Sequence, residues 1–248
     1  MPTGANSKRK YTYVWVSTII LIFGIFAVYE ITKRLKEGTV VEDDRLTGAS
    51  SINDLSFILA DGKKRKVPQF SFLNQDSLLV SNESYLGKVY VVEFFFTTCP
   101  TICPIMTKNL VELQETFVEY PDFGVASFTI NPRYDTPTVL KKYTERYGIT
   151  DSDWHLMTGD QDEIYKLAQE GFYIVANEVE DAPGGFEHSG MFALVDKNGY
   201  IRSRYDENGN PLIYYRGTIT EKQGVNSEGE PQQITMLKED IKKLLLEK

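Results

Sequence analysis

The chain is poor in the side chains that bind soft metals and form disulfides. Its 248 residues include only two cysteines, Cys99 and Cys103, and two histidines, His155 and His188. So few cysteines exclude a disulfide-rich secreted scaffold. A disulfide between residues four apart would close only a small loop, so a chemical role for the pair is favoured over a structural one. A soft-metal site made by one chain must draw on these four side chains and the methionines.

Basic residues are also too few for a nucleic-acid-binding protein. Lysine and arginine together number 27 against 35 aspartate and glutamate residues, which gives a formal net charge of -8. Proteins bind phosphate backbones largely through clustered basic side chains. Nucleic acid is therefore not expected as a partner.

One long hydrophobic run lies near the N-terminus. Residues 11–29 read YTYVWVSTIILIFGIFAVY, 19 residues without a charge. A helix of this length can cross the hydrocarbon core of a bilayer at about 1.5 Å per residue, and aromatic rings near its ends suit the interfaces. A cleaved signal peptide is the main alternative, but its apolar part is usually shorter and no A-x-A site follows. We predict one transmembrane anchor over residues 1–30.

The position of the rest of the chain follows from this anchor. Basic residues flank both ends of the run, so the positive-inside signal is nearly balanced. A short basic N-terminus still favours an inside location for residues 1–10, and it is too short and arginine-poor for a transit peptide. We expect a single-pass protein of the inner (cytoplasmic) membrane with its soluble domain on the periplasmic side. Residues 31–51 are predicted to be a tether and residues 52–248 one domain.

In that domain, strand patterns alternate with helix patterns. Strands are predicted at residues 88–96, 123–130, 155–157, 190–196 and 200–205, and a hairpin turn at Asp61-Gly62. Helices are predicted at residues 103–120, from Pro137, from Asp160 to Glu170, and at 236–246. This order predicts an α/β fold with a mixed sheet flanked by helices on both faces, which a thioredoxin-like fold satisfies.

The two cysteines lie where a predicted buried strand gives way to a helix. The segment 94–106 reads FFFTTCPTICPIM. Backbone N–H groups at a helix N-terminus favour negative charge, so this position should lower a thiol pKa. Thiols one helical turn apart can close a disulfide or hold one metal ion. The alternative, two small buried apolar residues, gives no reason for a pair at such a junction.

A histidine would complete a three-ligand site. His188 follows a glycine-containing loop and precedes a predicted strand, from where it can approach the cysteines, although a surface role is the alternative. His155 lies within a predicted strand, and a packed or solvent-facing role is expected for it. Two thiolates and an imidazole suit Cu(I), and Cu(II) with a weak further ligand, but they also suit zinc. The donor types alone leave the two metals open.

The cysteine segment resembles the T-x-C-P-x-x-C-P signature of the Sco/SenC family of copper-binding, thioredoxin-like cytochrome c oxidase assembly proteins. Ordinary thioredoxins have two residues between their cysteines, not three. Three later segments are similar to the family in the same order: SFTINPRYDTP at 127–137, WHLMTG at 154–159 and HSGMFALVDKNG at 188–199. Asn131 departs from the family's usual Asp, whereas Asp135 matches. Residues 206–234 look longer than the family needs.

The resemblance implies that Cys99, Cys103 and His188 bind copper, and that the two cysteines are also a redox pair. It implies a membrane-anchored copper chaperone or thiol redox factor that helps to assemble the binuclear copper site of cytochrome c oxidase. The copper-site subunit of the oxidase would be its partner. The alternative is an extracytoplasmic thiol-disulfide oxidoreductase or redox sensor without copper delivery. The resemblance thus implies mainly a metallochaperone and leaves thiol-disulfide oxidoreductase activity open.

Overall fold

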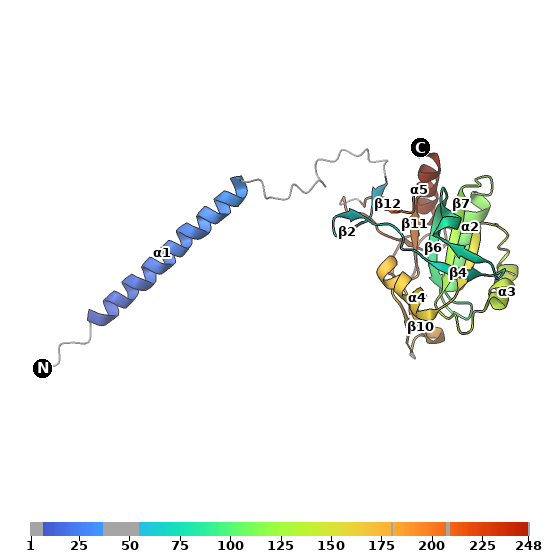
Figure 1. Cartoon of the computed structure of the whole chain (residues 1–248), viewed down its shortest axis with the longest axis horizontal. Helices are drawn as coiled ribbons and strands as arrows, with labels where there is room; N and C mark the ends of the chain where they lie inside the picture. Colours follow the sequence, from blue (N-terminus) through green and yellow to red (C-terminus); the bar gives the residue numbers. More distant parts are fainter. Residues whose placement is uncertain (1–6, 37–54, 180, 207–208, 248) are drawn as a thin grey trace. The chain divides into compact units, whose positions relative to one another are not determined.

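The computed structural model describes residues 7–36, 55–179, 181–206 and 209–247. The chain divides into two units, Met1–Ile52 and Asn53–Lys248 (Figure 1). The first contains helix α1, Ser7–Lys36, so residues 31–36 of the predicted tether are helical. Residues 37–51 of that tether lie outside the described residues. In the described parts of the chain, no helix is long and apolar enough to cross a membrane. The predicted transmembrane span is therefore not shown by the structure.

The second unit is built on the mixed sheet that the sequence predicts. Along its main path the strands lie in the order β1 (Ser56–Phe57), β12 (Ile201–Ser203), β11 (Met191–Val195), β6 (Val89–Phe95), β7 (Phe123–Thr129), β8 (Trp154–Thr158), β4 (Ser71–Asn74) and β5 (Leu79–Ser81). The three central strands β6, β7 and β8 are parallel, and all their other neighbours on the path pair antiparallel.

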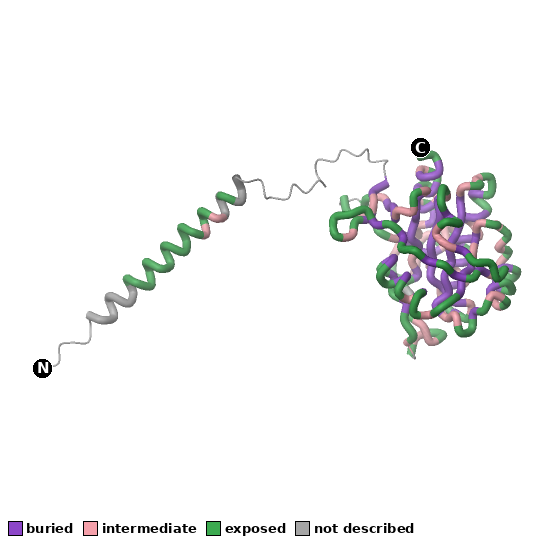
Figure 2. The backbone as a smooth tube through the Cα atoms, viewed as in Figure 1, coloured by how far each residue is buried: buried purple, intermediate pink, exposed green. Residues whose placement is uncertain are grey.

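The central strand β6 is buried on both faces, as its continuous apolar sequence predicts. Phe94 packs against Phe128 and Phe172 on one face of the sheet. Phe95, the next residue, points to the other face and packs against Tyr143. The buried core therefore extends on both sides of the sheet. The buried residues gather in the interior of this unit (Figure 2).

Four helices of the second unit contain most of the predicted helical segments. They are α2 (Cys103–Thr116), α3 (Pro137–Tyr147), α4 (Gln161–Lys166) and α5 (Ile234–Leu246). Pro137 begins α3 and Asp160 caps α4 by accepting a hydrogen bond from the N–H of Glu163 at 3.0 Å, both as predicted. One length was wrong: helix α2 ends at Thr116 rather than at residue 120. A π-helical turn over Leu167–Gly171 continues directly from α4, so the chain stays helical to the predicted end near Glu170.

Short strands are the features that the sequence did not predict. The turn at Asp61-Gly62 is confirmed, between β2 (Leu59–Ala60) and β3 (Lys63–Lys64). A second hairpin, β9 (Ala176–Glu178) with β10 (Phe186–His188), has no counterpart in the predicted pattern. Three-residue strands are too short for an alternating pattern to be recognised.

The segment after residue 205, which had no assigned role, completes the sheet and its packing. Strand β13 (Tyr215–Arg216) pairs with the start of β11, and the N–H of Gly217 donates to the carbonyl of Gly190 at 2.9 Å. From α2, the Asn109 side-chain amide donates to the carbonyl oxygens of Gly217 and Ile219 at 2.8 and 3.2 Å. This segment therefore holds the chain that follows β10 against α2.

Candidate copper and redox site

The cysteine loop connects β6 with α2, at the carboxyl end of the central strand. Cys103 is the first residue of α2, and Cys99 lies in the preceding turn, where its N–H donates to the carbonyl of Phe96 at 3.2 Å. The N–H of Cys103 points at the Cys99 sulfur, with 3.5 Å between the nitrogen and Sγ. A helix-terminal N–H donor of this kind stabilises negative charge on sulfur.

Asp135 fixes the start of the cysteine loop. This carboxylate is fully buried and accepts hydrogen bonds from the Thr97 N–H at 3.0 Å, from the Thr97 hydroxyl and from the Thr129 hydroxyl. Burial raises the pKa of Asp135, and the hydroxyl and amide donors oppose that rise. The Asn131 carbonyl accepts from the Asp135 N–H at 2.9 Å, so the backbone of Asn131 helps to place this carboxylate.

The two thiols have different surroundings. Cys99 is 7% exposed and lies against two surface pockets, whereas Cys103 is 1% exposed. Burial raises the pKa of Cys103 far above that of a solvated thiol. The prediction that the helix N-terminus lowers a thiol pKa is therefore wrong for Cys103, because desolvation outweighs the helix terminus there. The N–H of Cys103 at this helix terminus instead points at the sulfur of Cys99.

The β9–β10 hairpin packs directly on the cysteine loop. The rings of Phe186 in β10 and Phe96 lie 5.0 Å apart. Between the two strands, Gly184 has a φ of +80°, and a Cβ placed on it would lie 2.8 Å from Cε2 of Phe96 and 3.2 Å from Cδ of Pro100. The hairpin and the cysteine loop are thus in contact along these side chains.

His188 is the last residue of this hairpin, paired with Ala176. The structure does not describe its side chain, but it does describe the residues on either side of it, Glu187 and Gly190 among them. Glu187 lines a pocket of about 380 Å³ together with Cys99. On the other side, a Cβ on Gly190 would lie 3.2 Å from Cδ1 of Ile102, the residue before Cys103. The residues before and after His188 therefore lie close to the cysteine segment.

The contact at Gly184 gives a prediction about this packing. Gly184→Ala should cost about 1–2 kcal/mol more unfolding free energy than Gly185→Ala, because a methyl group there collides with the buried Phe96 ring. Gly185 is a matched control: its φ is +83° but its Cβ would meet nothing within 4 Å. Urea unfolding of both variants measures the difference, and the iodoacetamide reaction rate of Cys99 should rise only in Gly184→Ala. Equal losses in the two variants would argue against the contact.

The other histidine has a different environment. His155 on β8 lies with its Nδ1 3.2 Å from Nδ2 of Asn74 and its ring 5.7 Å from that of Tyr85. Burial lowers the pKa of His155. None of these residues lines either pocket beside Cys99. Met106 is fully buried in the core. Among the side chains that the structure describes, no three His, Cys, Asp or Glu groups form a metal cluster.

A buried glutamate behind the cysteine loop was not predicted as a functional residue. Glu93 lies on β6, opposite Ser127 of β7, whose hydroxyl donates to its Oε1 at 2.7 Å. Its Oε2 is buried without a hydrogen-bond partner. Burial raises the pKa of Glu93 to about 7, and its charge adds to the rise in the pKa of Cys103. Its signal in the sequence is a single carboxylate inside an otherwise apolar strand.

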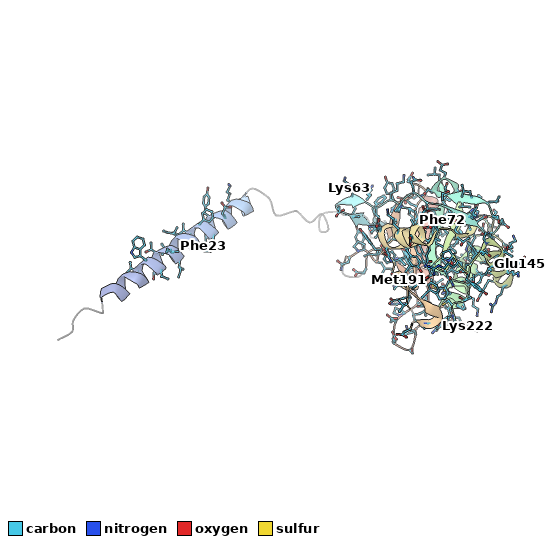
Figure 3. The ribbon with its side chains drawn as sticks, turned by 60° about the horizontal axis from the view of Figure 1, so that its bottom comes forward. Phe23, Lys63, Phe72, Glu145, Met191 and Lys222 are labelled. Atoms are coloured by element: carbon cyan, nitrogen blue, oxygen red, sulfur yellow. The ribbon has the colours of Figure 1, made fainter. Side chains whose placement is uncertain are left out.

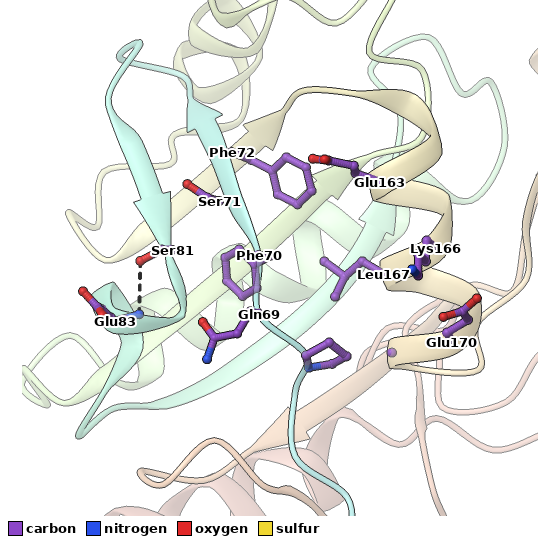
Figure 4. Close-up of a pocket in the computed structure, with 12 residues that line it drawn as sticks. Gln69, Phe70, Ser71, Phe72, Ser81, Glu83, Glu163, Lys166, Leu167 and Glu170 are labelled. Atoms are coloured by element: carbon purple, nitrogen blue, oxygen red, sulfur yellow. Dashed lines mark hydrogen bonds between the residues drawn. The ribbon is translucent and has the colours of Figure 1, made fainter.

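The largest of the described pockets lies away from the cysteines. It measures about 730 Å³ and is lined by Phe70, Phe72 and Leu167, with Glu163 and Lys166 at its edge (Figure 4). Neither cysteine lines it. The candidate copper and redox site is therefore defined by the two thiols and not by pocket volume.

The fold and the site together define a class: a thioredoxin-like protein with a cysteine pair at the junction of a central strand and a helix. The SCO1/SenC family model matches residues 60–220. The SCO1 protein homolog of Bacillus subtilis (strain 168) is 34% identical over 150 residues, which cover 60% of this chain and 77% of that protein. The chain belongs to the SCO1/SenC family.

Solved structures show the same fold. A SCO1/SenC family lipoprotein from Bacillus anthracis str. Ames is 28% identical with a TM-score of 0.60, covering 73% of this chain and 95% of that one. BsSco, a member of the Sco family of cytochrome c oxidase assembly proteins with a disulfide switch, is 29% identical with a TM-score of 0.58, covering 74% and 95%. More distant is copper-bound ScoI of Bradyrhizobium japonicum, 22% identical with a TM-score of 0.47, covering 57% and 89%.

Proposed function

We propose that this protein is a copper chaperone and thiol redox factor that helps to assemble the binuclear copper site of cytochrome c oxidase. Cys99, Cys103 and His188 are the proposed copper ligands, and the copper-site subunit of the oxidase is the proposed partner. One observation carries the proposal: the hairpin that ends at His188 packs on the loop that holds both cysteines. Family membership supports the same assignment.

The donor types fit copper as cargo. Two thiolates and one imidazole are soft and borderline ligands that suit Cu(I), and they also hold Cu(II) when a weak further ligand is added. Burial raises the pKa of the Cys103 thiol, so a bound cation has to compete with the proton of this thiol. Copper uptake should therefore release protons and become weaker as the pH falls.

The second candidate is a thiol-disulfide oxidoreductase or redox sensor without copper delivery. It is favoured by the N–H of Cys103 that points at the Cys99 sulfur, because this donor stabilises an attacking thiolate. Both functions use the same two cysteines. They differ in their need for His188, since thiol exchange does not require an imidazole ligand.

A metal titration tests the proposed function. The reduced full chain in detergent should bind one copper ion per chain, and copper should displace zinc from it. Oxidation to the Cys99–Cys103 disulfide should abolish binding, because a disulfide has no thiolate to offer. Binding is measured by competition with a chromophoric chelator. Equal copper uptake by the reduced and oxidised chains would exclude these cysteines as ligands.

We further propose that residues 1–30 anchor the protein in the inner membrane, with 31–51 as tether and 52–248 as the copper-binding domain on the periplasmic side. The support is the uncharged run at 11–29, in which the described apolar side chains of α1, such as Ile20 and Phe23, are exposed. Apolar side chains all around a helix are typical of a lipid-facing segment.

The anchor gives a direct prediction. The full chain should stay in the membrane pellet after an alkaline carbonate wash, because the helix interior carries no charge to draw it into water. A chain that begins at Ser50 should appear in the supernatant. Ile20→Arg with Phe23→Arg in the full chain should also shift it to the supernatant, since each central charge costs about 3 kcal/mol of insertion free energy. Release of the unaltered full chain would contradict the anchor.

A further inference from the structure

Cys99 lies between two pockets of opposite charge. Among the side chains that the structure describes, the pocket of about 380 Å³ on the hairpin side has Asp181 and Glu187 in its lining and no lysine or arginine. On the α3 side, the described lining of a groove of about 490 Å³ contains Lys142 and Arg146 and no carboxylate. We call the second pocket the α3 groove. The thiol can therefore be approached from two sides that select opposite charges.

The two cations of the α3 groove are available to a partner. Lys142 and Arg146 lie one helical turn apart on α3 and are exposed. In the part of the chain that the structure describes, neither forms an ion pair, whereas neighbouring Lys141 is paired with Asp76 at 2.6 Å. Glu145, the acidic residue between them in sequence, does not line the groove.

We propose that the α3 groove receives an acidic, cysteine-containing segment of the partner protein and directs its sulfur to Cys99. The whole chain carries a net charge of -8, so an acidic partner is repelled by the chain as a whole and attracted at this groove. The half-exposed ring of Tyr134 provides an apolar wall beside the cations. Approach from this side leaves the hairpin that carries His188 in place over the other side of Cys99.

The proposal deepens the proposed function and rests on it for the identity of the partner. In the thiol reaction, the Cys99 thiolate attacks the disulfide of the partner, forms a mixed disulfide and displaces one partner thiolate. Cys103, after losing its proton, then attacks the Cys99 sulfur and displaces the second partner thiolate. The partner gains two electrons and two thiols, and this chain is oxidised to the Cys99–Cys103 disulfide.

Charged peptide disulfides test the groove. The probes are two synthetic peptides with one cysteine activated as a thiopyridyl disulfide, flanked by four glutamates in one and four lysines in the other. With the full chain carrying Cys103→Ser, the acidic peptide should react with Cys99 about tenfold faster than the basic one at low salt. The preference should shrink at 0.5 M salt, because salt screens surface charges.

Charge reversal in the groove provides the deciding comparison. Lys142→Glu with Arg146→Glu should abolish or invert the preference. Lys63→Glu with Lys222→Glu is the matched control, since both lysines are exposed, lie away from α3 (Figure 3) and give the same change in net charge. An equal effect of the two pairs, no preference in the unaltered groove, or no reaction with either peptide would overturn the proposal. If the chain with both cysteines fails to bind copper while the charge preference is retained, only the proposed copper function is contradicted.

Discussion

His188→Ala should lower copper affinity at least tenfold, about 1.4 kcal/mol, while most of the thiol-exchange activity remains. The substitution removes one of three proposed ligands, and two thiolates alone do not provide a stable set for Cu(II). Thiol exchange should suffer less because Cys99 keeps the N–H donor of Cys103, 3.5 Å from its sulfur. Chelator competition measures the affinity, and reduction of a model disulfide measures the exchange. Oxidase assembly should fail together with copper binding.

The controls separate the copper and oxidoreductase functions. Cys99→Ser and Cys103→Ser should each abolish copper binding and complete reduction of a model disulfide, although the Cys103→Ser chain still forms the mixed disulfide through Cys99. His155→Ala removes the other histidine, which contacts Asn74 and Tyr85 rather than the cysteine loop, and should leave copper affinity within about twofold. Normal oxidase assembly by the His188→Ala chain would mean that copper binding through this residue is not the function. The oxidoreductase would then be the better description.

Glu93→Gln should remove a large pH dependence from the stability of the protein. Burial raises the pKa of Glu93 from 4.5 to about 7, so the folded protein holds this proton more tightly than the unfolded chain does. The stabilisation from Glu93 is therefore fully present below pH 4.5 and is lost as the pH rises through 7. The loss amounts to about 3 kcal/mol at pH 8. An amide does not ionise, so the variant should lack this loss.

Urea unfolding of the metal-free, reduced full chain between pH 4.5 and 8 measures this effect. The difference in unfolding free energy between Glu93→Gln and the unaltered chain should grow by up to about 3 kcal/mol over that range in favour of the variant. Comparing the two chains cancels the titration of the other groups. The exposed Glu115 provides the control. The plot of unfolding free energy against pH for Glu115→Gln should be parallel to that of the unaltered chain. If the plot for Glu93→Gln is also parallel to that of the unaltered chain, the Glu93 carboxyl group is not held protonated by the fold.

Sequence patterns were sufficient to predict a helix or strand when residues close in the sequence fix where it begins and ends. The apolar run at 88–96 predicted β6, and the helix pattern at 103–120 predicted α2. Capping chemistry at Asp160 and proline at residue 137 placed two helix starts. The cysteine spacing and the four family-like segments were enough to recognise the family. Each of these signals depends on neighbours in the sequence, which the chain alone specifies.

Other features depend on residues far apart in the chain. The β9–β10 hairpin forms because Phe186 and Gly184 pack on the cysteine loop, and its three-residue strands have no pattern of their own. The sequence likewise offered the helix N-terminus as the main influence on the thiols, whereas tertiary burial decides the pKa of Cys103.

The charges on the two sides of Cys99 are a further example, because they come from α3 and from the hairpin, which only the folded chain brings together. The sequence by itself thus indicated the candidate site residues, the order of most elements and the family. The tertiary structure decided which thiol is buried, what packs on the cysteine loop and which charges face it. Solvation and long-range packing set these properties, and neither is a local property of the chain.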